Sequence, residues 1–168
     1  MKNAQEQFAE AYTKYSEDLF RYGFFRVNDR ELAKDLIQET FMKAWRYMEK
    51  DPASVLNIRA FLYKILGNLI IDQYRKRRDE ASLEVLHEEG FDPAFDDTSR
   101  WADVLDGEQA RVLLKQVPEP YREAVLLRYV EDLSLTEIAK ITGVSQNTIS
   151  VRVHRGIDKL REIYNSKK

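Results

Sequence analysis

The chain has 168 residues and a net charge of −2; 43% of the residues are hydrophobic, 33% are charged, and only six are glycine and four proline. This composition suits a mostly helical folded protein better than a disordered or turn-rich one. Cysteine is absent, so disulfide frameworks and thiolate metal sites are excluded. No segment resembles a signal peptide or approaches the ~20 apolar residues of a membrane span, so we expect a cytoplasmic protein.

Charge is distributed unevenly along the chain. The stretch from Asp79 to Glu108 holds eleven acidic residues and one arginine, a local charge of −10, so the other 138 residues carry +8. Basic surfaces favour a polyanionic partner. The acidic stretch can compete with that partner, or it can serve only as a solvated linker. Charge alone leaves both interpretations open.

Three helices are predicted in the first half of the chain. Apolar residues recur at helical spacing over about residues 5–26, 28–50 and 57–78. Asn28, with Glu31 three residues later, is predicted to cap the second of these helices. Thirteen of the 19 aromatic residues precede residue 79, which gives this half enough bulky side chains for a core of its own. We therefore predict a domain over residues 1–78.

The second half predicts a linker and another group of helices. Regular periodicity is lost over residues 79–105, where acidic residues collect. Four helices are then predicted, over about residues 106–117, 120–130, 135–141 and 146–164. The expected fold class is all-α, with two small helical bundles, residues 1–78 and 106–168, joined by the acidic linker.

Residues 133–154 have the pattern of a helix-turn-helix. Ser134 and Glu137 are spaced as a capping box at the start of its first helix. Gly143 supplies the tight turn, and Ser145 caps the second helix. The pattern indicates DNA binding, with a purely structural helical hairpin as the alternative.

The start of the second helix favours DNA binding over a structural hairpin. Its third residue is Thr148, whereas the first helix has Glu137 at the corresponding position. A carboxylate would repel a phosphate approaching the helix N-terminus. We expect this recognition helix to read base edges from its N-terminal end. The candidate DNA-contacting residues are Ser145, Gln146, Asn147, Thr148, Ser150, Arg152, His154 and Arg155.

Two further motifs make the whole chain resemble the extracytoplasmic-function group of bacterial RNA polymerase sigma factors. Residues 35–45, DLIQETFMKAW, resemble the family segment that docks on the clamp coiled coil of the polymerase largest subunit. Residues 61–75, FLYKILGNLIIDQYR, resemble the segment that melts and reads the minus-ten element. The resemblance covers about residues 5–165 and implies a sigma region 2-like domain followed by a region 4-like helix-turn-helix domain.

The resemblance implies an alternative sigma factor, which directs promoter recognition and DNA melting and catalyses no reaction. The implied partners are core RNA polymerase, through its clamp coiled coil and beta flap, promoter DNA and an anti-sigma factor. No cofactor, metal or small-molecule substrate is implied. The recognition helix would read the minus-thirty-five element.

Two groups of residues in the first domain are candidates for these contacts. An acidic strip on one helix face, at i, i+3, i+4 and i+7 spacing, would dock core polymerase, although a solvated helix face has the same pattern. It consists of Asp35, Gln38, Glu39 and Met42. In the family, the loop before the third helix holds a flipped base. Amide and aromatic groups can hold such an unstacked base, and cations can contact the backbone. The minus-ten candidates are Asn57, Arg59, Tyr63, Asn68 and Arg75.

Two other classes of protein are weighed against this interpretation. A stand-alone helix-turn-helix regulator, with N-terminal helices that dimerise or sense a signal, shares the second domain but needs no polymerase-docking strip. An enzyme such as a small hydrolase needs a nucleophile motif, a phosphate-binding glycine loop or a His/Cys/carboxylate constellation. The sequence shows none of these patterns.

Overall fold

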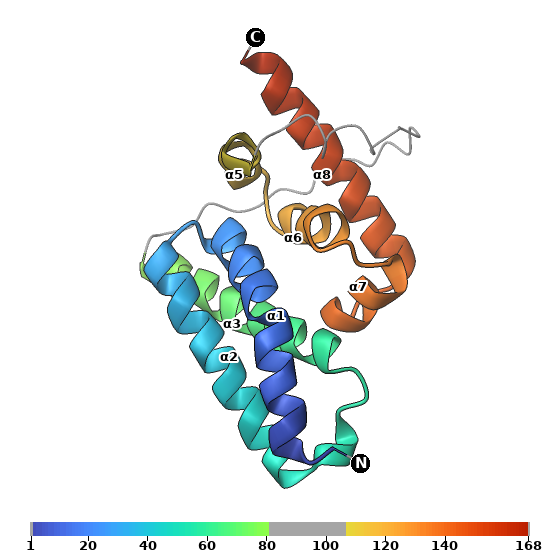
Figure 1. Cartoon of the computed structure of the whole chain (residues 1–168). Helices are drawn as coiled ribbons and strands as arrows, with labels where there is room; N and C mark the ends of the chain where they lie inside the picture. Colours follow the sequence, from blue (N-terminus) through green and yellow to red (C-terminus); the bar gives the residue numbers. More distant parts are fainter. Residues whose placement is uncertain (1, 81–106, 168) are drawn as a thin grey trace. The chain divides into compact units, whose positions relative to one another are not determined.

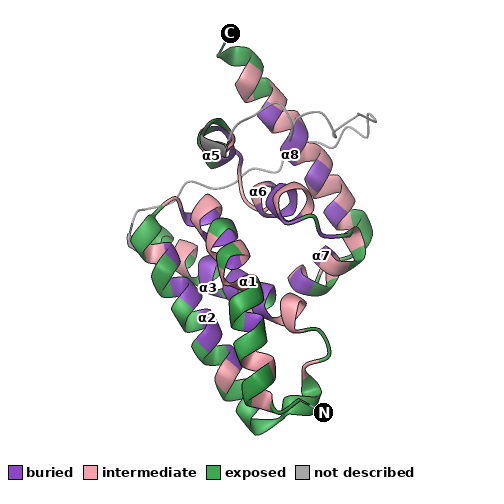
Figure 2. Cartoon of the chain, in the orientation of Figure 1, coloured by how far each residue is buried: buried purple, intermediate pink, exposed green. Residues whose placement is uncertain are grey.

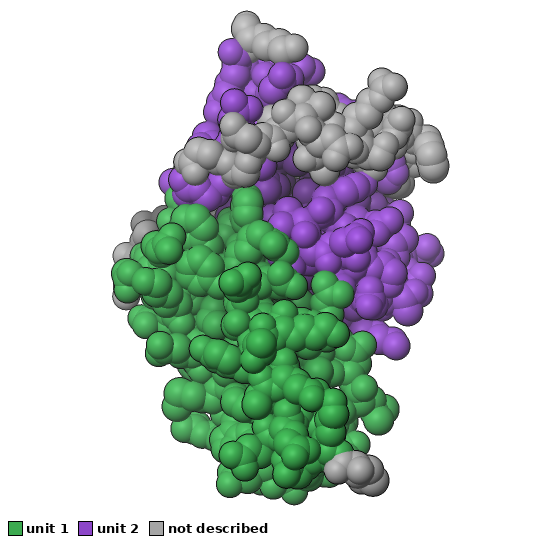
Figure 3. Space-filling view, viewed as in Figure 1, with its two compact units in different colours: residues 1–83 green, residues 84–168 purple. Residues whose placement is uncertain are grey.

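The structure is a computed structural model that describes residues 2–80 and 107–167 (Figure 1). Within these ranges every regular element is a helix, which confirms the all-α prediction. The chain divides into two compact units, residues 1–83 and 84–168 (Figure 3). The predicted linker falls almost entirely outside the described residues. In the described ranges, no helix combines the length and the apolar character needed to cross a bilayer.

Over residues 2–80, the first unit is a bundle of three helices, each in contact with the other two. They are α1 (Ala4–Val27), α2 (Arg30–Lys50) and α3 (Ile58–Glu80), with a short 3₁₀ turn η1 (Pro52–Ser54) between the last two. Their bounds agree with the predicted ranges to within two residues. Each helix carries buried residues along its length, and the opposite sides of α1 and α2 are largely exposed (Figure 2).

The junction of α1 and α2 corrects one prediction. Asn28 does not cap α2; it ends α1 with a left-handed backbone (φ 54°), and its N–H donates to the Phe24 carbonyl at 2.8 Å. The cap of α2 is Asp29, whose carboxylate accepts a hydrogen bond from the Leu32 N–H at 3.0 Å. Asparagine tolerates left-handed backbone better than most residues, so the chain reverses within two residues.

A buried arginine joins the end of α1 to α3. Arg26 is only 2% exposed, and its Nη1 donates to the Tyr22 hydroxyl at 2.9 Å. Its guanidinium also lies over the rings of Tyr22 and Tyr74, and the Tyr74 hydroxyl donates to the Arg26 carbonyl. Aromatic faces and hydrogen bonds offset part of the cost of burying the charge.

In the described part of the second unit, residues 107–167, the chain forms five helical segments. They are α5 (Gly107–Lys115), α6 (Tyr121–Val125), η3 (Leu126–Val130), α7 (Leu135–Thr142) and α8 (Gln146–Ser166). The predicted helix over residues 120–130 is therefore present, but its second half, η3, is a π-helical turn in which the Glu131 N–H donates to the Leu126 carbonyl at 3.0 Å. The long helix α8 packs against α5, α6 and α7.

Arg122 ties the end of α5 to the start of α6. Its Nε donates to the Val117 carbonyl at 3.0 Å, and its Nη2 donates to the Lys115 carbonyl at 2.8 Å. Carbonyls at a helix C-terminus have no hydrogen-bond partner inside the helix. A side chain that donates to them therefore stabilises the helix end.

The helices α6 and α8 cross closely at Gly156. A Cβ atom at this position would lie 2.3 Å from Val125 Cγ2 and 3.1 Å from the Tyr121 carbonyl oxygen. Next to it, the Arg155 guanidinium lies 5.8 Å from the centre of the Tyr121 ring, and its Nη1 donates to the Tyr121 hydroxyl at 3.1 Å. The missing side chain and this pair together fix how α8 lies on α6.

We predict that Gly156→Ala lowers the free energy of unfolding of the second unit by about 1–3 kcal/mol, the usual cost of an overpacked contact. Val125 is branched and the Tyr121 oxygen belongs to the backbone, so neither can yield easily. Gly23→Ala is the matched control, because its Cβ would meet Ile37 Cδ1 at an ordinary 3.7 Å. Denaturant unfolding measures both; equal stability of the two variants would contradict the close crossing.

Candidate nucleic-acid interface and docking surface

The acidic strip on α2 is open to solvent. All four predicted residues, Asp35, Gln38, Glu39 and Met42, are exposed. Met42 is 55% exposed although it is apolar. Glu39 lies 3.8 Å from Lys43, and both side chains are about half exposed, so this ion pair contributes little to stability. The face therefore offers carboxylates and one apolar side chain to a partner.

Three of the five minus-ten candidates lie at the surface, and they are Asn57, Asn68 and Arg75. Asn57 stands before α3 as its cap, because its Oδ1 accepts a hydrogen bond from the Ala60 N–H at 3.0 Å. Arg75 lies 3.9 Å from Asp72, with both side chains largely exposed. Amide and cationic groups are thus displayed along α3 and its preceding loop.

Tyr63, another minus-ten candidate, lies in the core of the bundle and not at the surface. Tyr63 is 0% exposed, and its ring makes an edge contact with Tyr22 at a centroid distance of 5.4 Å. It lies three residues before Leu66 and seven before Ile70, both fully buried, so its helical phase places it in the core. Arg59 is half-buried and lies over the Tyr63 ring, 5.9 Å from its centre.

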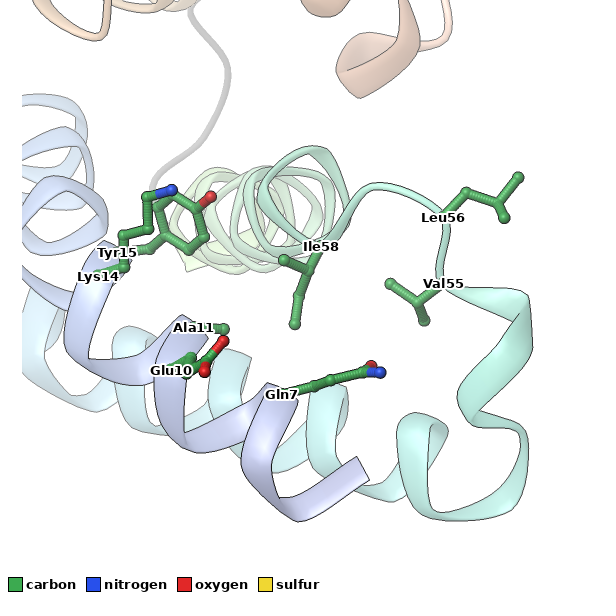
Figure 4. Close-up of a pocket in the computed structure, with 8 residues that line it drawn as sticks. All are labelled: Gln7, Glu10, Ala11, Lys14, Tyr15, Val55, Leu56 and Ile58. Carbon is green, nitrogen blue, oxygen red and sulfur yellow. The ribbon is translucent and has the colours of Figure 1, made fainter. Parts of the chain in front are cut away.

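A pocket of about 370 Å³ lies beside the loop that precedes α3 (Figure 4). One wall comes from α1, with Gln7, Glu10, Ala11, Lys14 and Tyr15, and the other comes from Val55, Leu56 and Ile58. Leu56 is 96% exposed, which is unusual for a leucine. The sequence predicts the loop but not its neighbour, because the two walls are far apart along the chain.

One aromatic pair near the same loop is not predicted from the sequence. Tyr47 of α2 is 50% exposed, and its ring lies 5.1 Å from the ring of Phe61 in α3. Tyr47 falls outside the apolar stripe of α2. An aromatic residue at such an exposed helix position is the sequence signal that could have indicated a surface role for Tyr47.

In the second unit, α7 and α8 form the predicted helix-turn-helix. Ser134 Oγ accepts from the Glu137 N–H at 3.1 Å, and Glu137 Oε2 accepts from the Ser134 N–H at 2.9 Å. Gly143 has a left-handed backbone with φ 76°. Ser145 Oγ accepts from the Thr148 N–H at 3.2 Å. The capping box, the glycine turn and the second cap are therefore confirmed.

The first turn of α8 contains no acidic residue and presents polar side chains. Ser145, Gln146 and Asn147 are exposed. Farther along, four of the predicted residues are half-buried, and they are Thr148, Ser150, Arg152 and His154. The N-terminal end of α8, where helix N–H groups favour an anion, is thus the open part of this surface.

Two details of this surface differ from the sequence prediction. Arg155 is half-buried and donates to the Tyr121 hydroxyl, so it holds α8 against α6 rather than facing outward. Thr136 of α7, which the sequence did not single out, accepts a hydrogen bond from Gln146 Nε2 at 3.0 Å. The sequence shows no pattern for this contact, because it joins the starts of two separate helices.

The chain matches two family models. The model described as Sigma-70 region 2 matches residues 11–80, and the model described as Sigma-70, region 4 matches residues 107–160. The chain is similar to the RNA polymerase sigma factor SigV of Bacillus subtilis (strain 168), with 32% identity over 156 residues that cover 89% of this chain and 86% of the relative. It is 30% identical to the ECF RNA polymerase sigma factor SigW of the same strain, over 96% of this chain and 90% of the relative.

Two solved structures are similar as well. The sigma factor RpoE, in complex with the anti-sigma factor NepR from Bartonella quintana, has a TM-score of 0.73 and 25% identity; the match covers 97% of this chain and 99% of that one. CnrH, in complex with the cytosolic domain of CnrY, has a TM-score of 0.71 and 23% identity, over 98% of this chain and 91% of that one. The second likeness concerns the fold alone.

We predict that Ser145→Ala lowers the free energy of unfolding of the second unit by about 1 kcal/mol, because the Thr148 N–H loses its acceptor. Ser145→Asp should leave stability nearly unchanged, since aspartate is an equally good helix cap. Thermal unfolding of the three proteins checks this. A stable Ser145→Ala protein would mean that the cap is not needed.

Proposed function

The chain belongs to the sigma-70 family of RNA polymerase sigma factors, in its extracytoplasmic-function group, and we propose a role for each of its two units. As an alternative sigma factor, it directs RNA polymerase in transcription initiation. One observation carries the division of roles: the region 2 match falls on the first unit and the region 4 match on the second.

The first unit, residues 1–78 of our proposed domain division, docks core polymerase and opens the minus-ten element. The second, residues 106–168, reads the minus-thirty-five element and contacts the beta flap. Residues 79–105 form the acidic linker between them. The protein works by binding alone, without a cofactor, and acts in the cytoplasm, where polymerase and chromosome meet. An anti-sigma factor is a further proposed partner, because RpoE was solved in complex with one.

A stand-alone helix-turn-helix regulator explains less. It accounts for the second unit but not for the region 2 match over residues 11–80. Nor does it explain why similarity to SigV extends over 89% of the chain. The two classes differ in one measurable property, since only a sigma factor needs core polymerase to act.

The strip on α2 supports docking to the clamp coiled coil. Asp35 and Glu39 supply carboxylates, and the exposed Met42 supplies a flexible apolar side chain on the same helix face. None of the three is needed for the core of the unit, because all are exposed. Such a face suits a partner helix rich in arginine, whose guanidinium groups pair well with carboxylates.

The loop before α3 supports contact with the unwound minus-ten strand. Asn57 and Asn68 display amides, and Arg75 provides a cation for the backbone. Arg59 belongs to the same region but is half-buried. The neighbouring pocket has room for an unstacked base, whose polar edge Gln7 can contact. Tyr63 is excluded from this proposal because it is buried.

The open end of α8 supports major-groove reading of the minus-thirty-five element. Gln146 and Asn147 are exposed amides in the first turn, suited to base edges. Ser145, Thr148 and Ser150 add hydroxyl groups for the phosphate backbone, and Arg152 and His154 lie farther along the same helix. Arg155 is left out, since Tyr121 already holds it.

Run-off transcription with purified core polymerase and a library of promoter fragments tests the proposed function. We expect transcripts only when both the protein and core polymerase are present, from promoters that share two elements at constant spacing. Tight and specific promoter binding by the isolated protein, together with no association with core polymerase, would favour the stand-alone regulator instead.

We predict that Glu39→Lys weakens binding to core polymerase at least about tenfold, because a like charge facing an arginine-rich helix costs more than a lost contact. Fluorescence anisotropy of labelled protein titrated with core polymerase measures the affinity. Glu17→Lys is the matched control, since Glu17 is an exposed carboxylate on α1, outside the strip. If both variants bind as the unchanged protein does, the strip is not the docking surface.

We predict that Ser145→Asp weakens promoter binding by the polymerase complex more than Ser145→Ala does. The aspartate keeps the helix cap but brings a negative charge to the helix end that we assign to phosphate. Stability and DNA affinity would then rank the two variants in opposite orders. Electrophoretic mobility shifts at constant salt measure the affinity. Equal affinities of the two variants would mean that this helix end does not contact phosphate.

A further inference from the structure

The hydrogen bond between α7 and α8 joins two exposed side chains at the interface assigned to DNA. Thr136 is the second residue of α7, and Gln146 is the first residue of α8. Gln146 Nε2 donates to Thr136 Oγ1 at 3.0 Å. The two residues are ten positions apart, so the contact exists only because the turn at Gly143 brings the two helix starts together.

This contact adds little to the packing of the two helices. Their shared core is apolar and comprises Ile138, Ile141 and Ile149, which are 0–5% exposed. The helix starts have caps of their own, at Ser134 and Ser145. Both Thr136 and Gln146 are exposed, where water can replace a lost hydrogen bond. What the contact does restrict is the direction of the Gln146 amide.

A glutamine amide carries two N–H donors and one carbonyl acceptor. If Thr136 accepts the N–H that points away from the carbonyl, the second N–H and the carbonyl form an adjacent donor and acceptor in a plane that Thr136 sets. In the major groove, adenine presents an adjacent acceptor, N7, and donor, the N6 amino group. The two edges match, and glutamine pairs with adenine through both bonds at once.

We propose that Thr136 is a positioning residue for promoter recognition, which orients the Gln146 amide to read an adenine in the minus-thirty-five element. This inference rests on the proposed function, since it names the base that one side chain of the recognition helix reads. Thr136 need not touch DNA. Its hydroxyl selects one orientation of the amide before binding, so less conformational freedom is lost when the base pairs.

Thr136→Val tests the proposal, because valine keeps the shape of threonine and removes the hydroxyl. The holoenzyme, assembled from core polymerase and the full chain, is assayed by run-off transcription on templates with every base at each minus-thirty-five position. We expect one position with an adenine preference that Gln146→Ala abolishes. Thr136→Val should reduce that preference about fivefold and leave the other positions unchanged, in line with the discrimination of a paired amide. Thr136→Ser, which retains the hydroxyl, should preserve it.

Two further measurements separate positioning from a structural role. Adding Thr136→Val to Gln146→Ala should change nothing more, because the residue it orients is gone. The midpoint of thermal unfolding should stay the same in Thr136→Val. Unchanged base preferences in Thr136→Val, a uniform loss at all positions, or a Gln146-dependent preference for a base other than adenine would each overturn the inference. If the unchanged protein fails to initiate transcription on any template, the proposed function itself is wrong.

Discussion

The crossing of α6 and α8 at Gly156 is the constraint on which the second unit depends. A side chain at this position would collide with Val125 and with the backbone of Tyr121, so the two helices approach only because glycine has no Cβ. The Arg155–Tyr121 pair lies beside the crossing and holds the same two helices together. With α8 seated in this way and capped at Ser145, its first turn is left open, and that turn is the part of the helix that we assign to DNA.

In the first unit, aromatic side chains hold the helices together. The buried Arg26 contacts Tyr22 of α1 and Tyr74 of α3, and its contacts with Tyr74 tie the C-terminal end of α1 to α3. Polar side chains on the outer faces of α2 and α3 take no part in the core, so they are available for partners. Tyr63 is the opposite case, because its aromatic ring, although of a kind that can stack on a base, is buried in the core of the bundle.

The two units together suggest how modest contacts produce a specific promoter reader. Each unit offers exposed amides, at Asn57 and Asn68 in the first and at Gln146 and Asn147 in the second. Holding both on one polymerase makes the second contact intramolecular, which raises the effective concentration without adding any new contact. The stretch from Asp79 to Glu108 carries −10 and the remaining residues carry +8. That the acidic stretch competes with DNA, rather than serving only as a solvated linker, stays a prediction.

Local signals in the sequence determined the helices, the capping box at Ser134, the turn at Gly143 and the exposed strip on α2, because helical spacing and caps depend on near neighbours. Only the tertiary structure decided what depends on distant neighbours. It determined that Tyr63 is buried, that Arg155 contacts Tyr121 and that Thr136 lies beside Gln146, because each of these outcomes is set by how one helix packs against another. The cap of α2 at Asp29 rather than Asn28 is a local outcome, because Asn28 takes the left-handed position that ends α1.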